Sequence, residues 1–169
     1  RELPGEGSRE HRIGIVVIVG ETVERGLPGP GRKDREHAFG QLRHRREAAA
    51  PGNRAGAGAL DVFYGIVRDN NLGRAVLHLE YEAFPEMCEG VLRQIEAEMK
   101  VRWPVLGFAV AHRTGRVEIG EPSLIVAVAT GHRRESFEAC HWAVDRIKER
   151  LPVWKKEFFE GGEVWIEGD

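Results

Sequence analysis

Apolar residues along the second half of this chain fall into short continuous runs and into longer stretches with helical spacing. Residues 123–130, SLIVAVAT, are almost uninterrupted apolar positions, which is typical of a central strand buried on both faces. Residues 59–67, ALDVFYGIV, and 75–84, AVLHLEYEAF, are rich in β-branched and aromatic residues. The turn-forming cluster RDNNLGR lies between these two segments, so the pattern predicts that they pair as a hairpin.

Two stretches have the spacing of amphipathic helices. Pro85 opens the first, where its missing N–H costs nothing, and Trp103-Pro104 ends it. The apolar positions expected in this helix are Met87, Val91, Leu92, Ile95 and Met99. The second helix is predicted to begin near Glu135 or Ser136. The apolar stripe expected on it consists of Phe137, Cys140, Val144, Ile147 and Leu151.

The remaining apolar runs predict further strands. Residues 105–112, VLGFAVAH, form one strand, which a turn at Thr114-Gly115 separates from a short second one. The segment EVWIE near the end of the chain predicts a last short strand. This order of elements favours an α+β domain with a mostly antiparallel sheet and helices packed against it.

The first 58 residues differ in composition from the rest. The β-branched run IGIVVIV, residues 13–19, predicts a buried strand. From Gly20 to Gly58 the chain is rich in Gly, Pro, Arg and Glu, and we interpret this segment as a weakly ordered connection. Its basic run, residues 43–46, is more typical of a solvated loop or helix face than of an anion site. We therefore divide the chain into residues 1–58 and a folded domain, 59–169.

Composition excludes several classes of protein. The chain has 169 residues, of which 41% are hydrophobic and 31% charged, and this suits one globular domain. A net charge of −2 argues against a dedicated nucleic-acid binder. No apolar run approaches the roughly 20 residues that span a bilayer. The two cysteines, Cys88 and Cys140, are too few for a disulfide scaffold, so we expect small core residues and a cytoplasmic, reducing setting.

Two basic segments follow predicted strands. In FYGIVRDNNLG, Gly65 indicates a bulge, and Arg68 lies where the strand meets its turn. Taken alone, this segment is explained by an ordinary hairpin with an exposed arginine. In HRTGRVEIGE, His112 and Arg113 end a strand, and a surface ion-pair cluster accounts for these residues. Neither segment predicts catalysis by itself.

Both ends of the second predicted helix are also basic. His132, Arg133 and Arg134 lie at its start, where backbone N–H groups favour anions, so a phosphate or carboxylate site and a capped, solvated helix fit equally well. Lys148 follows the buried stripe, and a Pro-Val-Trp turn could fold Lys155 and Lys156 back toward it. A lysine desolvated among cations becomes a nucleophile or base, although lysines also simply complement the helix dipole there.

Motifs of the common hydrolase and nucleotide-binding classes are absent from the sequence. The seven histidines are scattered without a metal-ligand spacing, so no metal site is predicted.

Five segments in the same order resemble the large (catalytic) subunit of molybdopterin synthase, the MoaE family. These segments are GALDVFYGIVRDNNLG, LEYEAFPEM, HRTGRVEIGE, AVATGHRRESFEA and IKERLPVWKKE, and the resemblance covers about residues 58 to 167. One departure is the segment 20–58, which does not look like the apolar helix that the family places there.

The resemblance implies an α/β-hammerhead fold and a homodimer. Each subunit would bind a small ubiquitin-like sulfur carrier, giving a heterotetramer. The carrier's C-terminal Gly-Gly thiocarboxylate would enter a pocket and pass its sulfur to cyclic pyranopterin monophosphate, and two rounds would build the dithiolene of molybdopterin. The resemblance implies neither a metal nor an organic cofactor in this reaction.

The resemblance also implies roles for individual residues. Lys148 and Lys155 match active-site lysines; for Lys148, stabilisation or capture of the acyl group and proton transfer are equally compatible with the sequence. The residues that match the substrate pocket are Arg68, His132, Arg133 and Phe63, with Arg134 and Lys156 as further contributors. The alternatives are a non-catalytic module that binds a ubiquitin-like carrier and an enzyme acting on another phosphorylated small molecule.

Overall fold

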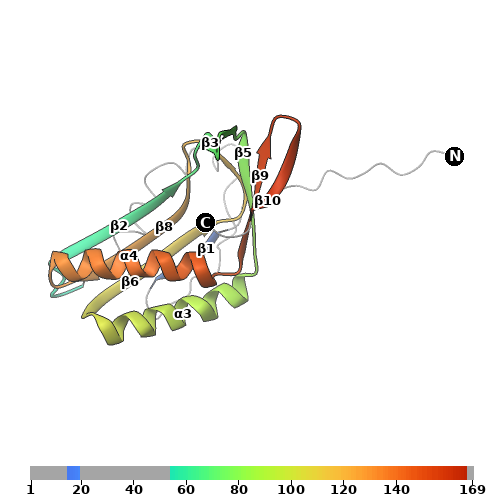
Figure 1. The fold of residues 1–169 in the computed structure, drawn as a ribbon. Helices are drawn as coiled ribbons and strands as arrows, with labels where there is room; N and C mark the ends of the chain where they lie inside the picture. The colour runs from blue at the N-terminus through green and yellow to red at the C-terminus, as the bar shows by residue number, and fades with distance from the viewer. Residues whose placement is uncertain (1–14, 20–53, 167–169) are drawn as a thin grey trace, which may run out of the picture.

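A four-stranded antiparallel sheet forms one half of the molecule (Figure 1). The structure is a computed structural model, and it describes residues 15–19 and 54–166, the former as backbone. The sheet has the strand order β1-β6-β8-β2, with the bounds Ile15–Val19, Val105–Arg113, Pro122–Thr130 and Ala59–Ile66. The predicted strand at 123–130 is confirmed as a central strand, since every residue from Ser123 to Thr130 is buried.

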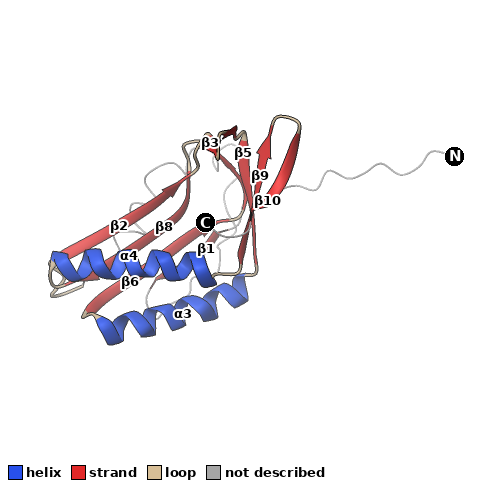
Figure 2. Cartoon of the chain, in the orientation of Figure 1, coloured by secondary structure: helices blue, strands red, loops and turns tan. Residues whose placement is uncertain are grey.

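Two long helices, α3 (Pro85–Arg102) and α4 (Arg133–Arg150), cover one face of this sheet (Figure 2). Leu92, Ile95 and Met99 of α3 pack with Phe108 and Val110 of β6. From α4, the core receives mostly small side chains: Ala139, Cys140, Ala143, Val144 and Ile147. Burial of this shared apolar surface is the main stabilising contribution to the fold.

The predicted helix faces need two corrections. Met87 and Phe137 were expected to be buried, but each is 59% exposed. The positions that are buried instead belong to small residues, including Cys88 in α3 and Ser136 in α4. Small side chains allow a helix to approach the sheet closely, and this rotates the larger side chains toward solvent. The second helix also begins at Arg133, two or three residues earlier than the expected Glu135 or Ser136.

A second antiparallel sheet lies beyond the first, with the order β10-β9-β5-β7. Its strands span Gly162–Ile166, Val153–Phe159, His78–Ala83 and Gly115–Glu118. The predicted pairing of segments 59–67 and 75–84 is wrong, because β2 pairs with β8 whereas β5 pairs with β9 and β7. The turn cluster between them forms its own hairpin, β3 (Asn70–Asn71) and β4 (Arg74–Ala75), around Leu72 and Gly73. Both turn residues have positive φ, of 50° and 80°, as in a type I′ turn.

Strand β9 was not predicted as a strand. The segment after Pro152 was interpreted as a turn that folds the two lysines back, but Val153–Phe159 is extended and pairs with both β5 and β10. Its strand partner β5 lies far away in the sequence, so the local pattern carried little information about this pairing. The α+β fold with mostly antiparallel strands, of hammerhead type, is confirmed, with the strands divided between two sheets.

Most of the proposed segment 1–58 lies outside the described residues, including the basic run at 43–46. The strand expected at 13–19 is present as β1, and β2 begins at Ala59. The division of the chain at 58/59 into two parts stays a prediction. Within the part of the chain that the structure describes, no helix is both long and apolar enough to cross a membrane.

Candidate active site

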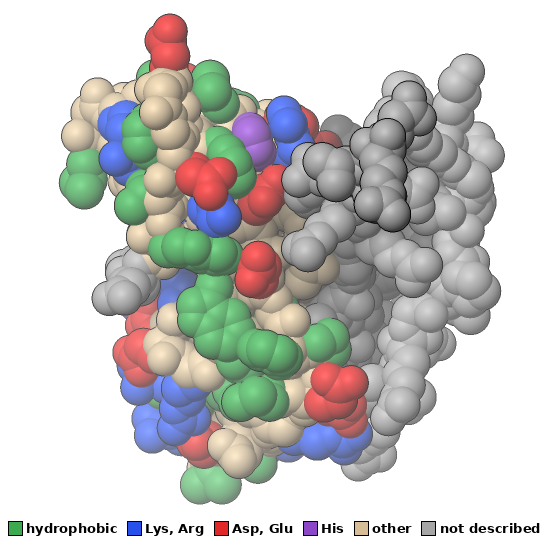
Figure 3. All heavy atoms as spheres, turned by 90° about the vertical axis from the view of Figure 1, so that its right-hand side faces the viewer, with side chains coloured by type: hydrophobic (Ala, Val, Ile, Leu, Met, Phe, Trp, Pro, Cys, Tyr) green, Lys and Arg blue, Asp and Glu red, His purple; other side chains and the backbone are tan. Residues whose placement is uncertain are grey.

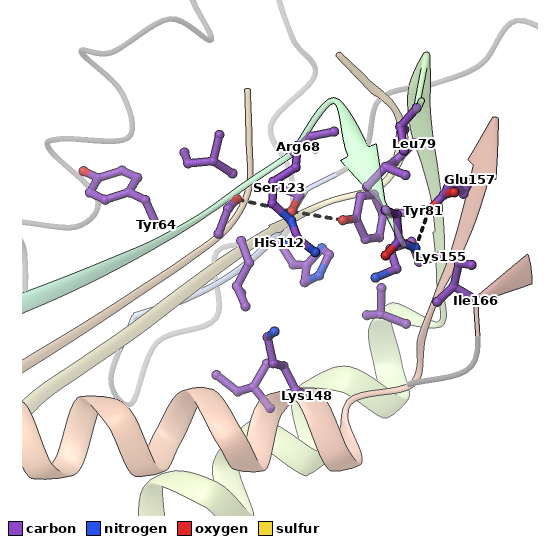
Figure 4. Close-up of a pocket in the computed structure, with 18 of the residues that line it drawn as sticks. Tyr64, Arg68, Leu79, Tyr81, His112, Ser123, Lys148, Lys155, Glu157 and Ile166 are labelled. Atoms are coloured by element: carbon purple, nitrogen blue, oxygen red, sulfur yellow. Dashed lines mark hydrogen bonds between the residues drawn. The ribbon is translucent and has the colours of Figure 1, made fainter. Parts of the chain in front are cut away.

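A pocket of about 660 Å³ lies where the two sheets and the C-terminal end of α4 come together (Figure 4). Its walls come from β2, β5, β8, β9 and the last turn of α4, so segments distant in the sequence contribute to one cavity. This volume is within the range of pockets that enclose a small molecule. The pocket is the strongest candidate for a functional site.

Three basic side chains line this pocket: Arg68, Lys148 and Lys155. Arg68 follows the end of β2, and Lys148 lies on the last turn of α4 next to buried Ile147. Lys155 comes from β9, on the same face as Glu157. Arg68 and Lys148 are exposed to solvent, so the pocket is open to molecules from outside. Phe63, the predicted aromatic neighbour, also lines the cavity and packs against the core.

The predicted cluster at the start of α4 lies elsewhere. His132, Arg133 and Arg134 are exposed and do not line the pocket. An α-helix rises about 1.5 Å per residue, so His132 and Lys148 are roughly 24 Å apart along the axis. Arg134 instead donates to Glu138 at 2.9 Å, and this hydrogen bond raises the pKa of Arg134. Within one chain, the two basic ends of α4 do not face the same cavity.

Lys156 also lies outside the pocket, because successive side chains of a strand point to opposite faces. Its Nζ donates to Glu163 at 2.9 Å and lies 4.7 Å from the ring centroid of Trp165. The hydrogen bond to Glu163 raises the pKa of Lys156. Lys155 and Lys156 therefore serve two different surfaces.

A buried carboxylate next to the cations was not anticipated. Glu157 is 2% exposed and accepts hydrogen bonds from Arg74 at 2.6 and 3.1 Å and from Asn71 at 2.8 Å. These bonds join β9 to the β3–β4 hairpin that follows Arg68. Buried charges are tolerated where paired and hydrogen-bonded in this way, so Glu157 holds the Arg68 turn in register with Lys155.

His112 is a further lining residue that the sequence did not indicate. The expected surface cluster is wrong for His112 and Arg113, which are 8% and 7% exposed. His112 Nδ1 lies 2.8 Å from the carbonyl oxygen of Arg113, and Tyr81 packs edge-on against the imidazole at 5.1 Å. Burial lowers the pKa of His112. The alternation Phe108, Val110, His112 on one face of β6 was the available signal, since the first two are core residues.

Hydroxyl groups complete the wall beside His112. The Tyr81 hydroxyl donates to Ser123 Oγ at 3.2 Å, and Ser123 Oγ donates to the carbonyl oxygen of Gly65 at 3.3 Å. Among the described residues, no group of three or more His, Cys, Asp or Glu side chains could hold a metal ion. Cys88 and Cys140 are both buried core residues, as expected, and burial raises the pKa of Cys140 to about 12.

The fold and the pocket define an α+β protein with Arg68, Lys148 and Lys155 on the wall of one cavity, an arrangement suited to an anionic small molecule. Two kinds of comparison extend this description. The family model of the MoaE protein matches residues 36–150. A molybdopterin synthase catalytic subunit from Halalkalibacterium halodurans is 47% identical over 110 residues, which are 65% of this chain and 70% of that protein. One from Pyrococcus abyssi is 46% identical over 123 residues, covering 73% and 83% of the two chains.

Solved structures agree with these relatives. The crystal structure of molybdopterin synthase from Staphylococcus aureus has a TM-score of 0.65 and 37% sequence identity, over 68% of this chain and 83% of that one. The chain therefore belongs to the MoaE family, and the resemblance seen in its sequence is confirmed. Its relatives are catalytic subunits of molybdopterin synthase, and the predicted role in molybdenum cofactor biosynthesis is confirmed at this level.

Proposed function

We propose that this chain catalyses sulfur transfer from the C-terminal thiocarboxylate of a small ubiquitin-like carrier to cyclic pyranopterin monophosphate, forming the dithiolene of molybdopterin. The observation that carries the proposal is the convergence of Arg68, Lys148 and Lys155 on one pocket. Both reactants are anions, one a thiocarboxylate and the other a cyclic phosphate. A cationic pocket in a chain whose relatives are molybdopterin synthase subunits suits both of them.

In this proposal the two lysines act on the carrier and the arginine on the substrate. Attack by the thiocarboxylate sulfur on a substrate carbon leaves an acyl–sulfur bond, and cleaving it places negative charge on the acyl oxygen. Lys148 and Lys155 stabilise that charge, because preorganised cations stabilise charge that develops in the transition state. Arg68 binds the phosphate through its bidentate guanidinium, and Phe63 packs beside the bound pterin.

The carrier reaches the pocket through its tail. A Gly-Gly terminus has no side chains, so it can pass in extended form into a cavity that is open at Arg68 and Lys148. Both cysteines of the chain are unpaired thiols, as suits a reducing compartment, and we place the reaction in the cytoplasm. Residues 59–169 form the catalytic domain in this proposal.

His132 and Arg133 would act in the pocket of a second copy of the chain. Because α4 separates these residues from Lys148 of their own chain, they can line a pocket only if a homodimer brings them to the partner's site. There they would add cations for the anionic substrate, with Arg134 next to them. The assembly would then contain two chains of this protein and two carriers.

The test mixes the full chain with a thiocarboxylated carrier and cyclic pyranopterin monophosphate and measures molybdopterin. We expect formation by the wild type and a loss of about 100-fold or more for Lys148→Ala, the usual cost of removing a group that stabilises developing charge. The matched control is Arg150→Ala, which removes a cation from the same helical turn outside the pocket and should stay near wild type. Carrier binding without molybdopterin formation by the wild type would instead identify a non-catalytic module.

A mixing experiment tests the second copy. The double variant His132→Ala/Arg133→Ala and the variant Lys148→Ala should each be slow, whereas mixed dimers should recover up to one working site per dimer. In such a dimer, one pocket combines an intact Lys148 with the partner's intact His132 and Arg133. No recovery after proven subunit exchange would contradict sites formed across two copies.

A further inference from the structure

The orientation of His112 follows from its hydrogen bond. A carbonyl oxygen can only accept, so the Nδ1 that lies 2.8 Å from the Arg113 carbonyl oxygen carries the hydrogen. In the neutral imidazole this leaves Nε2 as the nitrogen with the free electron pair. His112 lines the pocket, and Figure 4 shows its ring between Ser123 and Lys148. The geometry therefore presents a fixed neutral tautomer to the cavity.

Other polar side chains around the cavity are poorly placed to accept a proton. The carboxylate of Glu157 is held by Arg74 and Asn71, and the hydroxyl of Tyr81 donates to Ser123. Arginine and protonated lysine have donors and no acceptor. The ionisable groups that share the pocket with His112 are Tyr64 on β2, Arg68 after it, Tyr81 on β5, Lys148 on α4, and Lys155 and Glu157 on β9.

We propose that His112 is a catalytic residue, whose Nε2 accepts a proton from the water that cleaves the acyl–sulfur bond between carrier and product. This inference rests on the proposed function. It assigns a residue to a step that sulfur transfer requires, because the sulfur stays bonded to the carrier's acyl carbon until another nucleophile replaces it.

The step balances with water as the co-reactant. The water oxygen forms a bond to the acyl carbon while one of its protons moves to His112 Nε2. The carbonyl electron pair moves to oxygen, facing Lys148 and Lys155, and on its return the carbon–sulfur bond breaks with the pair remaining on sulfur. The carrier acid that forms loses the second proton of the water to solvent, and His112 also returns its proton to solvent. The products are therefore the carrier carboxylate and the product thiolate, with two protons released.

Burial of His112 suits this role. Burial lowers the pKa of His112 and so favours the neutral imidazole, which is the form that can accept a proton. The edge-on contact with Tyr81 and the bond to the Arg113 carbonyl fix the ring. A general base works only if it is held within reach of its proton.

Two substitutions separate proton acceptance from structure. His112→Asn keeps a donor near the Nδ1 position for the Arg113 carbonyl, and His112→Gln places an amide oxygen near the Nε2 position. Neither amide is basic. Under single turnover we expect both variants to form molybdopterin about 100-fold to 10,000-fold more slowly, the range for general-base catalysis. His78→Asn is the matched control, because His78 stacks on Phe158 outside the pocket and this variant should keep the wild-type rate.

The intermediate gives a sharper readout. If His112 acts in the water step, the acyl–sulfur adduct of carrier and substrate should accumulate with both variants, as an increase in carrier mass by mass spectrometry. In the wild type, breakdown of that adduct should slow only at a pH well below the ordinary histidine pKa of about 6.5, because burial lowers the pKa of His112. In His112→Asn the rate of adduct breakdown should lack this fall at low pH, while any pH dependence that comes from the other pocket groups should remain.

The possible results are distinct. A wild-type rate in His112→Gln, or slow variants without accumulated adduct, would overturn the assignment of His112 while leaving sulfur transfer intact. Failure of the wild type to form molybdopterin would overturn the proposed function itself. Because a folding defect would also slow the reaction, unfolding midpoints and carrier affinity of both variants should be compared with those of the wild type.

Discussion

Lys155 and Lys156 are neighbours in the chain but belong to opposite faces of the second sheet. Lys155 lies on the pocket face with Glu157, and Lys156 lies on the outer face with Trp165 and Glu163. The pocket face carries Lys155 and the Glu157 carboxylate, which is 2% exposed. On the outer face, charged side chains pair beside aromatic rings and remain accessible to water. Because side chains alternate between the two faces of a strand, two consecutive lysines of β9 lie in different surroundings.

Aromatic side chains are frequent on and beside the outer face of the second sheet. His78 stacks on Phe158 with ring centroids 4.3 Å apart, and Phe84 packs edge-on against Trp154 at 5.5 Å. Figure 3 shows hydrophobic side chains interleaved with acidic and basic ones on the side of the molecule that it views. Partly exposed aromatic pairs of this kind stabilise a sheet modestly. The contrast with the pocket face leads to three predictions, given in order of expected effect.

The largest contrast concerns the two lysines. Lys155→Ala should reduce molybdopterin formation by about 100-fold or more, because it removes a cation that faces the acyl oxygen. Lys156→Ala removes the same side chain one position later and should leave the rate within about twofold, since a surface ion pair contributes little. Single-turnover rates of the two variants, measured side by side, make the comparison. Equal losses would mean that the two faces do not differ in function.

The second contrast concerns the buried ion pair of the pocket face. Arg74→Met should lower the free energy of unfolding by about 3 kcal/mol, because the buried Glu157 carboxylate keeps its hydrogen bond from Asn71 but loses its ion pair. Glu157→Gln should cost about 1 kcal/mol, because Arg74 is 41% exposed and can be solvated. Urea unfolding provides both values. A larger loss for Glu157→Gln would show that the carboxylate is not the group that is costly to leave unpaired.

The third contrast uses two histidines. Burial lowers the pKa of both His112 and His78, so in each case the unfolded chain takes up a proton at a higher pH than the folded one. Stability is therefore full above about pH 6.5 and falls below it, by at most about 1.4 kcal/mol per pH unit for one proton. It stops falling once the folded protein is protonated too.

Urea unfolding between pH 7.5 and 5 should show a shallower decline for His112→Asn than for the wild type. His78→Asn should change the decline less, since His78 is only partly buried. A larger change for His78→Asn than for His112→Asn would mean that His78, on the outer face, is the more strongly desolvated histidine.

Several features of this fold could be predicted because their signals are local. The apolar run at 123–130 and the start of the first helix at Pro85 needed no distant partner to be recognised. Strand β9 could not be recognised, because residues 153–159 pair with β5, which lies 70 to 80 positions earlier in the chain. The false hairpin between 59–67 and 75–84 has the same origin, since the type I′ turn closes a shorter hairpin within the connection.

Only part of the candidate site could be predicted, because local sequence patterns mark some of its residues and not others. The local pattern put Lys148 beside a buried stripe and Arg68 at the end of a strand, but their roles were expected only from the resemblance of five ordered segments to one family. The separation of His132 and Lys148 within one chain follows from the length of the predicted helix, whereas the placement of Lys148 beside Arg68 and Lys155 depends on how the two sheets pack. Glu157 and His112 were missed because their burial depends on Arg74 and on the packing of two sheets, which no local pattern encodes.

The burial of both cysteines has an analytical consequence. Cys88 and Cys140 are the only thiols in this sequence, and each is at most 2% exposed. Thiolate is the reactive form towards alkylating agents, and a pKa raised by burial keeps these groups protonated. In the proposed reaction, an alkylating agent added to the native mixture should therefore label the carrier's thiocarboxylate and the new dithiolene, while Cys88 and Cys140 stay unlabelled. Label found on sulfur can then be assigned to the carrier or the product rather than to this chain.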